Sequence, residues 1–318
     1  MNTVESTPYI KKIREKLHLN RENLIPSLEM IKKTFLFDLC SVKRFVISIF
    51  IMVLVPALVI VFVPSYNLHS GASIVRLLGF LTWYYNFSIV FPIIIIGSTS
   101  PLISEELRSG TLLFLVSKPI NRPRIIMSKF IALFLFGVLV SFISLCIISL
   151  MALIKHPFVD IGSYLGIFFL YSLIILFFFG AMTMGFSSIF RRARNVLLIP
   201  LMLVIFSFLV IMGFKPLLLM TEDNWYEKYL LYNFDIGYQF ANIFIWIGEF
   251  FIPNMIDYYG EIFYMFGLTK WEYNPTEHSV TIIKTEYYHP VGSIFYFIII
   301  GGIFLVIGIL YLKKRDIS

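Results

Sequence analysis

Long apolar runs separated by polar segments dominate the pattern of this chain. Six runs contain no charged residue: Phe45–Val63, Leu77–Ser98, Phe130–Ile154, Ile161–Phe190, Val196–Phe214 and Val291–Leu312. A helix needs about 20 apolar residues to cross the hydrocarbon core of a membrane, and each run meets or nearly meets that length. Because lipid offers the backbone no hydrogen-bond partners, such runs must be helical. The pattern therefore predicts an all-α polytopic membrane protein with six transmembrane helices.

An amphipathic segment precedes the first run. From Glu22 onward, apolar residues recur at helical spacing while Lys and Glu lie off their stripe, which comprises Leu24, Leu28, Ile31, Phe35 and Leu39. A helix of this kind lies in the membrane interface. We expect residues 1–44 to be a basic cytoplasmic tail and interfacial helix, and residues 45–214 to hold the first five spans. Proline should kink three of these spans, at Pro56, Pro92 and Pro200.

A long mixed segment, residues 215–290, separates the fifth and sixth runs. It carries ten acidic residues against four lysines and many aromatic residues. Within it, Gln239–Pro253 is apolar, but it is short and contains Glu249. As a seventh span it would also place the basic C-terminal tail outside the cell. We therefore interpret the segment as extracytoplasmic, with interfacial or re-entrant helices. Loose alternation over Ser279–Tyr288 favours a strand or small hairpin.

Composition supports the membrane interpretation. The chain is 58% hydrophobic and 14% charged, whereas a soluble domain carries about a quarter charged residues. The formal charge of +7 is then attributed to topology and not to nucleic-acid binding. The two cysteines, Cys40 and Cys146, lie in different environments, so no disulfide is expected.

The distribution of Lys and Arg predicts the orientation. With six spans, residues 1–44, the loop between the second and third runs, the link after Phe190 and the tail 313–318 fall on one side. Together they hold 20 of the 26 basic residues. Positive charge stays in the cytoplasm, so both termini of this multi-pass cell-membrane protein are expected there. The basic N-terminal stretch also gives no sign of a cleavable signal peptide.

Several kinds of chemistry are missing from the sequence. No phosphate-binding GxxxxGK[ST] loop occurs, and none of the six runs contains the charged residue that ion-coupled carriers use. Hydroxyl residues in the runs have no neighbouring base. His278 and His289 lie near Glu277 and Glu286 without metal-ligand spacing. We expect no catalytic residue, no metal and no cofactor in this chain.

The polar loop 99–129 between the second and third runs is the most distinctive segment. Ser104 and the Gly110–Thr111 pair predict a short capped helix, which begins with the adjacent carboxylates Glu105 and Glu106. A polar helix this short needs a partner surface to hold it.

Ile103–Lys129 resembles the cytoplasmic signature of ABC-2 type permeases, the membrane subunits of one class of ABC exporter. The residues that carry the resemblance are Glu105, Glu106, Arg108, Gly110, Thr111, Leu112–Leu115, Ser117, Pro119, Ile120, Arg122 and Lys129. The amphipathic segment and the six spans also fit that family.

The resemblance implies how such a chain works. The helix at Ser104–Gly110 would be a coupling helix seated on a separate ATP-binding subunit, which binds ATP and Mg. The residues implied in coupling are Ser104, Glu105, Glu106, Arg108, Gly110 and Thr111, and the expected cytoplasmic basic anchors are Arg122, Arg124, Lys129, Arg191 and Arg192. A second permease copy or homologue would complete the pathway.

Two other classes of function stay open. The chain could be an ion-coupled secondary carrier or channel, whose transport would persist without ATP and follow an ion gradient. It could also be a membrane anchor for a soluble complex that lacks a phosphate-binding loop. Neither substrate nor oligomeric state follows from the sequence.

Overall fold

The six predicted membrane spans are all present in the fold. The computed structural model describes residues 27–62, 77–111, 122–155, 160–219, 225–253, 255–274, 279–285 and 287–314. Within that part of the chain, six helices are long and apolar enough to cross a membrane: Val42–Phe62, Leu77–Ser109, Arg122–Ile154, Ile161–Ile189, Ala193–Leu219 and Pro290–Lys314. The prediction of an all-α polytopic membrane protein is therefore confirmed.

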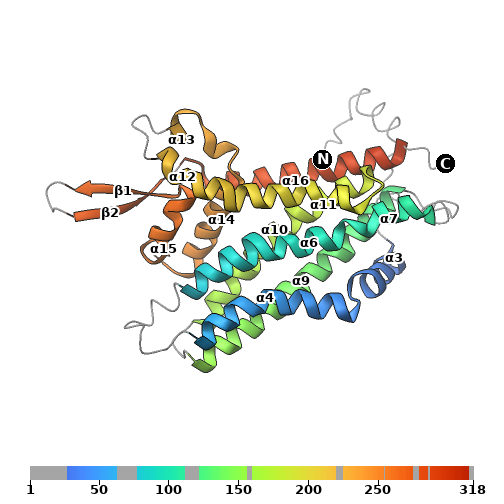
Figure 1. The fold of residues 1–318 in the computed structure, drawn as a ribbon, viewed down its shortest axis with the longest axis horizontal. Coiled ribbons are helices and arrows are strands. Elements are labelled where there is room, and N and C mark those ends of the chain that lie inside the picture. The colour runs from blue at the N-terminus through green and yellow to red at the C-terminus, as the bar shows by residue number, and fades with distance from the viewer. Residues whose placement is uncertain are drawn as a thin grey trace, which may run out of the picture.

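The helices form one elongated bundle (Figure 1). In chain order they are α3 (Leu28–Lys33), α4 (Val42–Phe62), α6 (Phe91–Thr99), α7 (Pro101–Ser109), α9 (Arg122–Lys155), α10 (Ile161–Ile189), α11 (Ala193–Ile205), α12 (Ile211–Leu219), α13 (Trp225–Lys228), α14 (Ile236–Phe251), α15 (Met255–Phe263) and α16 (Pro290–Lys314). Helix α10 is central: it packs against α6, α9, α14 and α16. It lies close to α16, where a Cβ on Gly185 would be 2.3 Å from the carbonyl oxygen of Phe304.

Segments of π-helix interrupt or adjoin several of the spans. They cover Thr34–Leu39, Thr82–Val90 and Phe206–Val210. The second of them ends beside Pro92, whose nitrogen has no hydrogen to donate to the helix ladder. Pro56 and Pro200 lie inside α4 and α11, and the kinks expected at them stay a prediction.

The two ends of the bundle differ in composition. Figure 1 shows α3, α7 and the C-terminal end of α16 at one end, which we call the α7 end. Described basic residues gather there, including Lys32, Arg108, Arg122, Arg192 and Lys313. At the opposite end, α13, α15 and a β-hairpin lie together, and we call this the hairpin end (Figure 1).

The predicted amphipathic helix is described from Leu28 as α3 and the π-helical segment that follows it. Leu39 is fully buried and Phe35 packs against the core, whereas Leu28 is exposed. The Ser27 amide donates to the Ser128 hydroxyl of α9, which fixes the start of α3 to the bundle. The first part of the predicted stripe, including Leu24, lies outside the described residues.

Residues 215–290 build the hairpin end. Besides α12 to α15, this segment contains two 3₁₀ turns, Leu231–Asn233 between α13 and α14 and Tyr264–Phe266 after α15. Two strands follow, β1 (Thr269–Asn274) and β2 (Ser279–Lys284). The strands pair antiparallel, with Thr269 opposite Lys284 and Asn274 opposite Ser279. The expected strand near Ser279 is thus confirmed, and its partner β1 was not predicted. Helix α14 has 16 residues, most of them buried against α10 and α16.

Candidate functional site

Helix α7 continues the second span instead of forming a separate short helix. Pro101 occupies its first position, and Ser100 keeps helical backbone angles, so one helical rod runs from Leu77 to Ser109. Ser104 was predicted near the start of the helix as a cap, but it lies mid-helix and is fully buried. Its hydroxyl donates to the Ser100 carbonyl oxygen, an i to i−4 bond typical of helix interiors.

The junction of α6 and α7 is held by Ser187 of α10. The Ser187 hydroxyl accepts from the amides of Ile103 (3.2 Å) and Ser104 (3.1 Å). It donates to the Ser100 carbonyl oxygen at 3.0 Å. These three bonds hold the Ser187 side chain against the backbone where α6 meets α7. Ser187 therefore couples the direction of α7 to the central helix.

The predicted stop at Gly110 is present. Its φ of +72° and ψ of 1° are left-handed, a conformation that glycine adopts without steric cost and that ends many helices. Just before it, the Ser109 hydroxyl donates to the Glu105 carbonyl oxygen and contacts the Thr111 hydroxyl at 2.9 Å. Residues 112–121 of the predicted motif, including Ser117 and Pro119, lie outside the described part of the chain.

The two adjacent glutamates of α7 point in different directions. Glu106 forms an ion pair of 2.5 Å with Lys129 of α9, and the Lys129 side chain is only 3% exposed. The Lys129 ammonium also donates to the Leu102 carbonyl oxygen. Lys129 was predicted to be a cytoplasmic basic anchor, but it is buried and ties α7 to α9.

Glu105 instead lies on the outer side of α7. It pairs with Arg108 at 3.0 Å, and the two side chains are 42% and 65% exposed. An exposed pair three residues apart stabilises a helix by only a few tenths of a kcal/mol, about 0.2–0.5. The pair therefore adds little to the fold and leaves one carboxylate and one guanidinium accessible to a partner.

A groove of about 340 Å³ lies beside Glu105. It lies between α7, the π-helical segment Thr34–Leu39 and the start of α4. Its walls are formed by Phe37, Asp38, Arg44, Pro101, Leu102, Glu105 and Glu106. The ring of Phe37 is 75% exposed at this surface. Acidic, basic and aromatic groups thus border one concave surface at the α7 end.

The remaining predicted anchors have two kinds of environment. Arg122 donates to the Leu312 and Lys313 carbonyl oxygens at 3.0 and 3.4 Å, so its positive charge lies at the C-terminus of α16. That placement is favourable for the helix dipole. Arg124 is half-buried, whereas Arg191 and Arg192 are exposed between α10 and α11. Only these last two have the accessibility expected of headgroup anchors.

The sequence pattern did not predict a buried charged network at the hairpin end. Lys215 and Asp235 form an ion pair with side chains 1% and 2% exposed. The Lys215 ammonium also donates to the Phe266 carbonyl oxygen at 3.0 Å, and the Tyr226 hydroxyl donates to Asp235 at 2.8 Å. Burial is the main cause that raises the pKa of Tyr226, and the Asp235 charge adds to it. Asp235 before an apolar stretch was a readable helix cap, but its partner Lys215 lies 20 residues away.

The described residues contain no group of three or more His, Cys, Asp or Glu able to hold a metal ion. His278 and Glu286 lie outside those residues. His289 is described, and its ring nitrogen Nδ1 accepts from the Val291 amide.

A comparison with protein families finds a match over most of this chain. A family model described as "ABC-2 family transporter protein" matches residues 27–317, a range that includes all six spans and α7. No curated protein matches the chain.

Proposed function

This chain belongs to the ABC-2 family of transporter proteins and is a membrane permease of an ABC transporter, and we propose that it serves an ATP-driven exporter. In this proposal α7 is the coupling helix, and a separate ATP-binding subunit holds ATP and Mg. The permease itself contributes no catalytic residue. A second copy or a homologue completes the pathway, both termini are cytoplasmic, and the hairpin end is extracytoplasmic.

The observation that carries the proposal is the two-sided character of α7. One side is fixed to the bundle through Glu106–Lys129 and Ser187, and the other exposes the Glu105–Arg108 pair beside the groove. Because α7 is continuous with the second span and bonded to α9 and α10, a displacement of its exposed side would move these helices directly. Charge-assisted hydrogen bonds suit such a contact because they are short and directional.

The first experiment tests the docking residues. The permease is co-expressed with the ATP-binding subunit, and Glu105→Arg and Arg108→Glu are compared with wild type by co-purification and ATPase activity. Each single reversal should weaken ATPase stimulation by about tenfold, as expected for losing a charged hydrogen bond worth ~1.5 kcal/mol. Arg194→Glu, an exposed cation on α11, serves as the matched control.

Two outcomes would overturn this assignment. If both α7 variants stimulate ATPase activity like the control, α7 is not the docking element. If purified permease transports its substrate without any ATP-binding subunit, in response to an ion gradient, the ATP-driven mechanism is wrong.

A second experiment tests the orientation. After Cys40 and Cys146 are replaced by serine, Ser109→Cys reports on the α7 end and Phe234→Cys, at an 80% exposed position, on the hairpin end. A membrane-impermeant maleimide added to intact cells should label only the Phe234→Cys variant. Labelling of Ser109→Cys from outside would contradict the proposed topology.

A further inference from the structure

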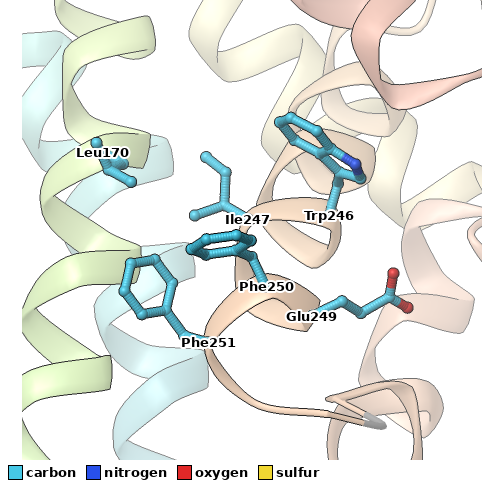
Figure 2. A pocket seen from close by; sticks show the side chains of 6 residues that line it. All are labelled: Leu170, Trp246, Ile247, Glu249, Phe250 and Phe251. Carbon is cyan, nitrogen blue, oxygen red and sulfur yellow. The ribbon is translucent and has the colours of Figure 1, made fainter.

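An apolar cavity of about 400 Å³ opens on the side of the bundle between α10 and α14. Its walls are formed by Leu170 of α10 and by Trp246, Ile247, Glu249, Phe250 and Phe251 of α14. Figure 2 shows the two phenylalanine rings and Ile247 on the side that faces Leu170, with the Glu249 carboxylate turned away from them. Volumes of 300–1,000 Å³ are typical of small-molecule sites.

The cavity lies along the membrane-spanning part of the bundle, nearer to the hairpin end. Leu170 lies nine residues beyond Ile161, the first residue of α10, which places it ~13 Å along the helix. Between them, the Phe251 ring lies so close to Gly166 that a Cβ there would be 2.7 Å from a ring carbon. Phe251 is therefore seated in a notch on α10, and it fixes the end of α14 beside the cavity.

The cavity is charged at its rim, where the carboxylate of the lining residue Glu249 turns away from the apolar side chains. Lys284 of β2 donates to both carboxylate oxygens of Glu249 at 3.2 Å. The two side chains are 21% and 32% exposed, so each retains access for a further partner. Trp246, 41% exposed, lies on the same helix, and tryptophan favours the boundary between hydrocarbon and headgroups.

The chemistry of the walls and the rim selects an amphiphile. Phe250 is 84% exposed although it borders an apolar cavity, as expected for a side chain that meets a hydrocarbon chain. A carboxylate and an ammonium side by side complement a headgroup that carries both an ammonium and a phosphate. An anionic headgroup alone would satisfy Lys284 and leave Glu249 facing like charge.

We propose that this cavity binds one acyl chain of a phosphatidylethanolamine molecule from the leaflet at the hairpin end. The chain lies against Leu170, Ile247 and Phe250. The headgroup ammonium contacts Glu249, and the phosphate contacts Lys284. The site does not depend on α7 or on an ATP-binding subunit, so it stands or falls independently of the proposed coupling.

The test uses the full-length protein in phosphatidylglycerol nanodiscs. A trace of phosphatidylethanolamine or phosphatidylglycerol with a diazirine on its acyl chain is added, and labelled peptides are identified after irradiation. With wild-type protein, labelling of peptides containing Leu170 or Trp246–Phe251 should be about tenfold higher for phosphatidylethanolamine. Equal labelling by the two lipids would overturn the headgroup assignment without the need for any variant.

Variants separate the cavity from ordinary lipid contact. Leu170→Trp should fill the cavity and lower labelling about tenfold, whereas Leu198→Trp, at a 45% exposed position on α11, should not. Glu249→Gln with Lys284→Gln should abolish the preference between lipids while chain labelling persists. If the lipid labels the cavity peptides of Leu170→Trp and Leu198→Trp to the same extent, only bulk lipid contacts this surface and the proposal is refuted.

Discussion

The contact between Glu106 and Lys129 gives the sharpest prediction from this structure. Glu106→Gln keeps the shape of the side chain and removes its charge. The Lys129 ammonium, on a side chain that is 3% exposed, would then keep its hydrogen bond to the Leu102 carbonyl oxygen but lose its ion pair. The more distant Asp38 carboxylate also acts on Lys129, but a buried ammonium group that loses its direct ion-pair partner is strongly destabilising.

The size of the effect follows from the burial of the pair. Removing one partner of a buried ion pair costs about 3–5 kcal/mol. The Glu106 side chain is 25% exposed, so water reaches this site from one side, and we take the lower limit of about 3 kcal/mol. At ~2 °C per kcal/mol, the midpoint of thermal unfolding should fall by about 6 °C.

The neighbouring glutamate supplies the control. Glu105→Gln makes the same chemical change one residue away, but its pair with Arg108 is exposed and should contribute less than about 0.5 kcal/mol. In a Cys40→Ser background, both variants can be followed at one heating rate with a thiol-reactive dye that reports the increase in exposure of half-buried Cys146. Glu106→Gln should lower the midpoint, and Glu105→Gln should leave it unchanged while it weakens stimulation of the ATP-binding subunit.

A compensating change completes the test. Glu106→Gln combined with Lys129→Met removes the unpaired charge, so stability should return to within about 1 kcal/mol of wild type. The reasoning is refuted if Glu106→Gln melts like wild type, or if the double variant is no more stable than the single one.

Three further changes test other contacts of the bundle. Gly185→Ala should force α10 away from α16 and cost about 1–3 kcal/mol, whereas Gly302→Ala, with open space around it, should be neutral in the same melting assay. Asp235→Asn leaves buried Lys215 without its counter-charge, so the unfolding midpoint should fall as for Glu106→Gln, and a midpoint like that of wild type would contradict it. Ser187→Ala removes three hydrogen bonds at the α6–α7 junction and should cost about 1–2 kcal/mol, with weaker ATPase stimulation as the second readout.

The sequence by itself determined the class of the fold. Six charge-free runs of membrane-spanning length predict six helices, because a backbone in lipid must satisfy its own hydrogen bonds. The helix stop at Gly110 was also predictable, because the left-handed conformation is a local property of the chain. The motif at Ile103–Lys129 was sufficient to indicate the family.

Only the tertiary structure decided what each charged residue does. Consecutive residues of a helix point about 100° apart, so Glu105 and Glu106 cannot face the same surroundings, but the sequence does not say which faces inward. The surroundings of Lys129 and Lys215 are likewise hidden in the sequence. Hydropathy places each lysine next to an apolar run, and only the packing shows that each is buried against a carboxylate. Burial of charge depends on partners distant in the chain, which local patterns do not record.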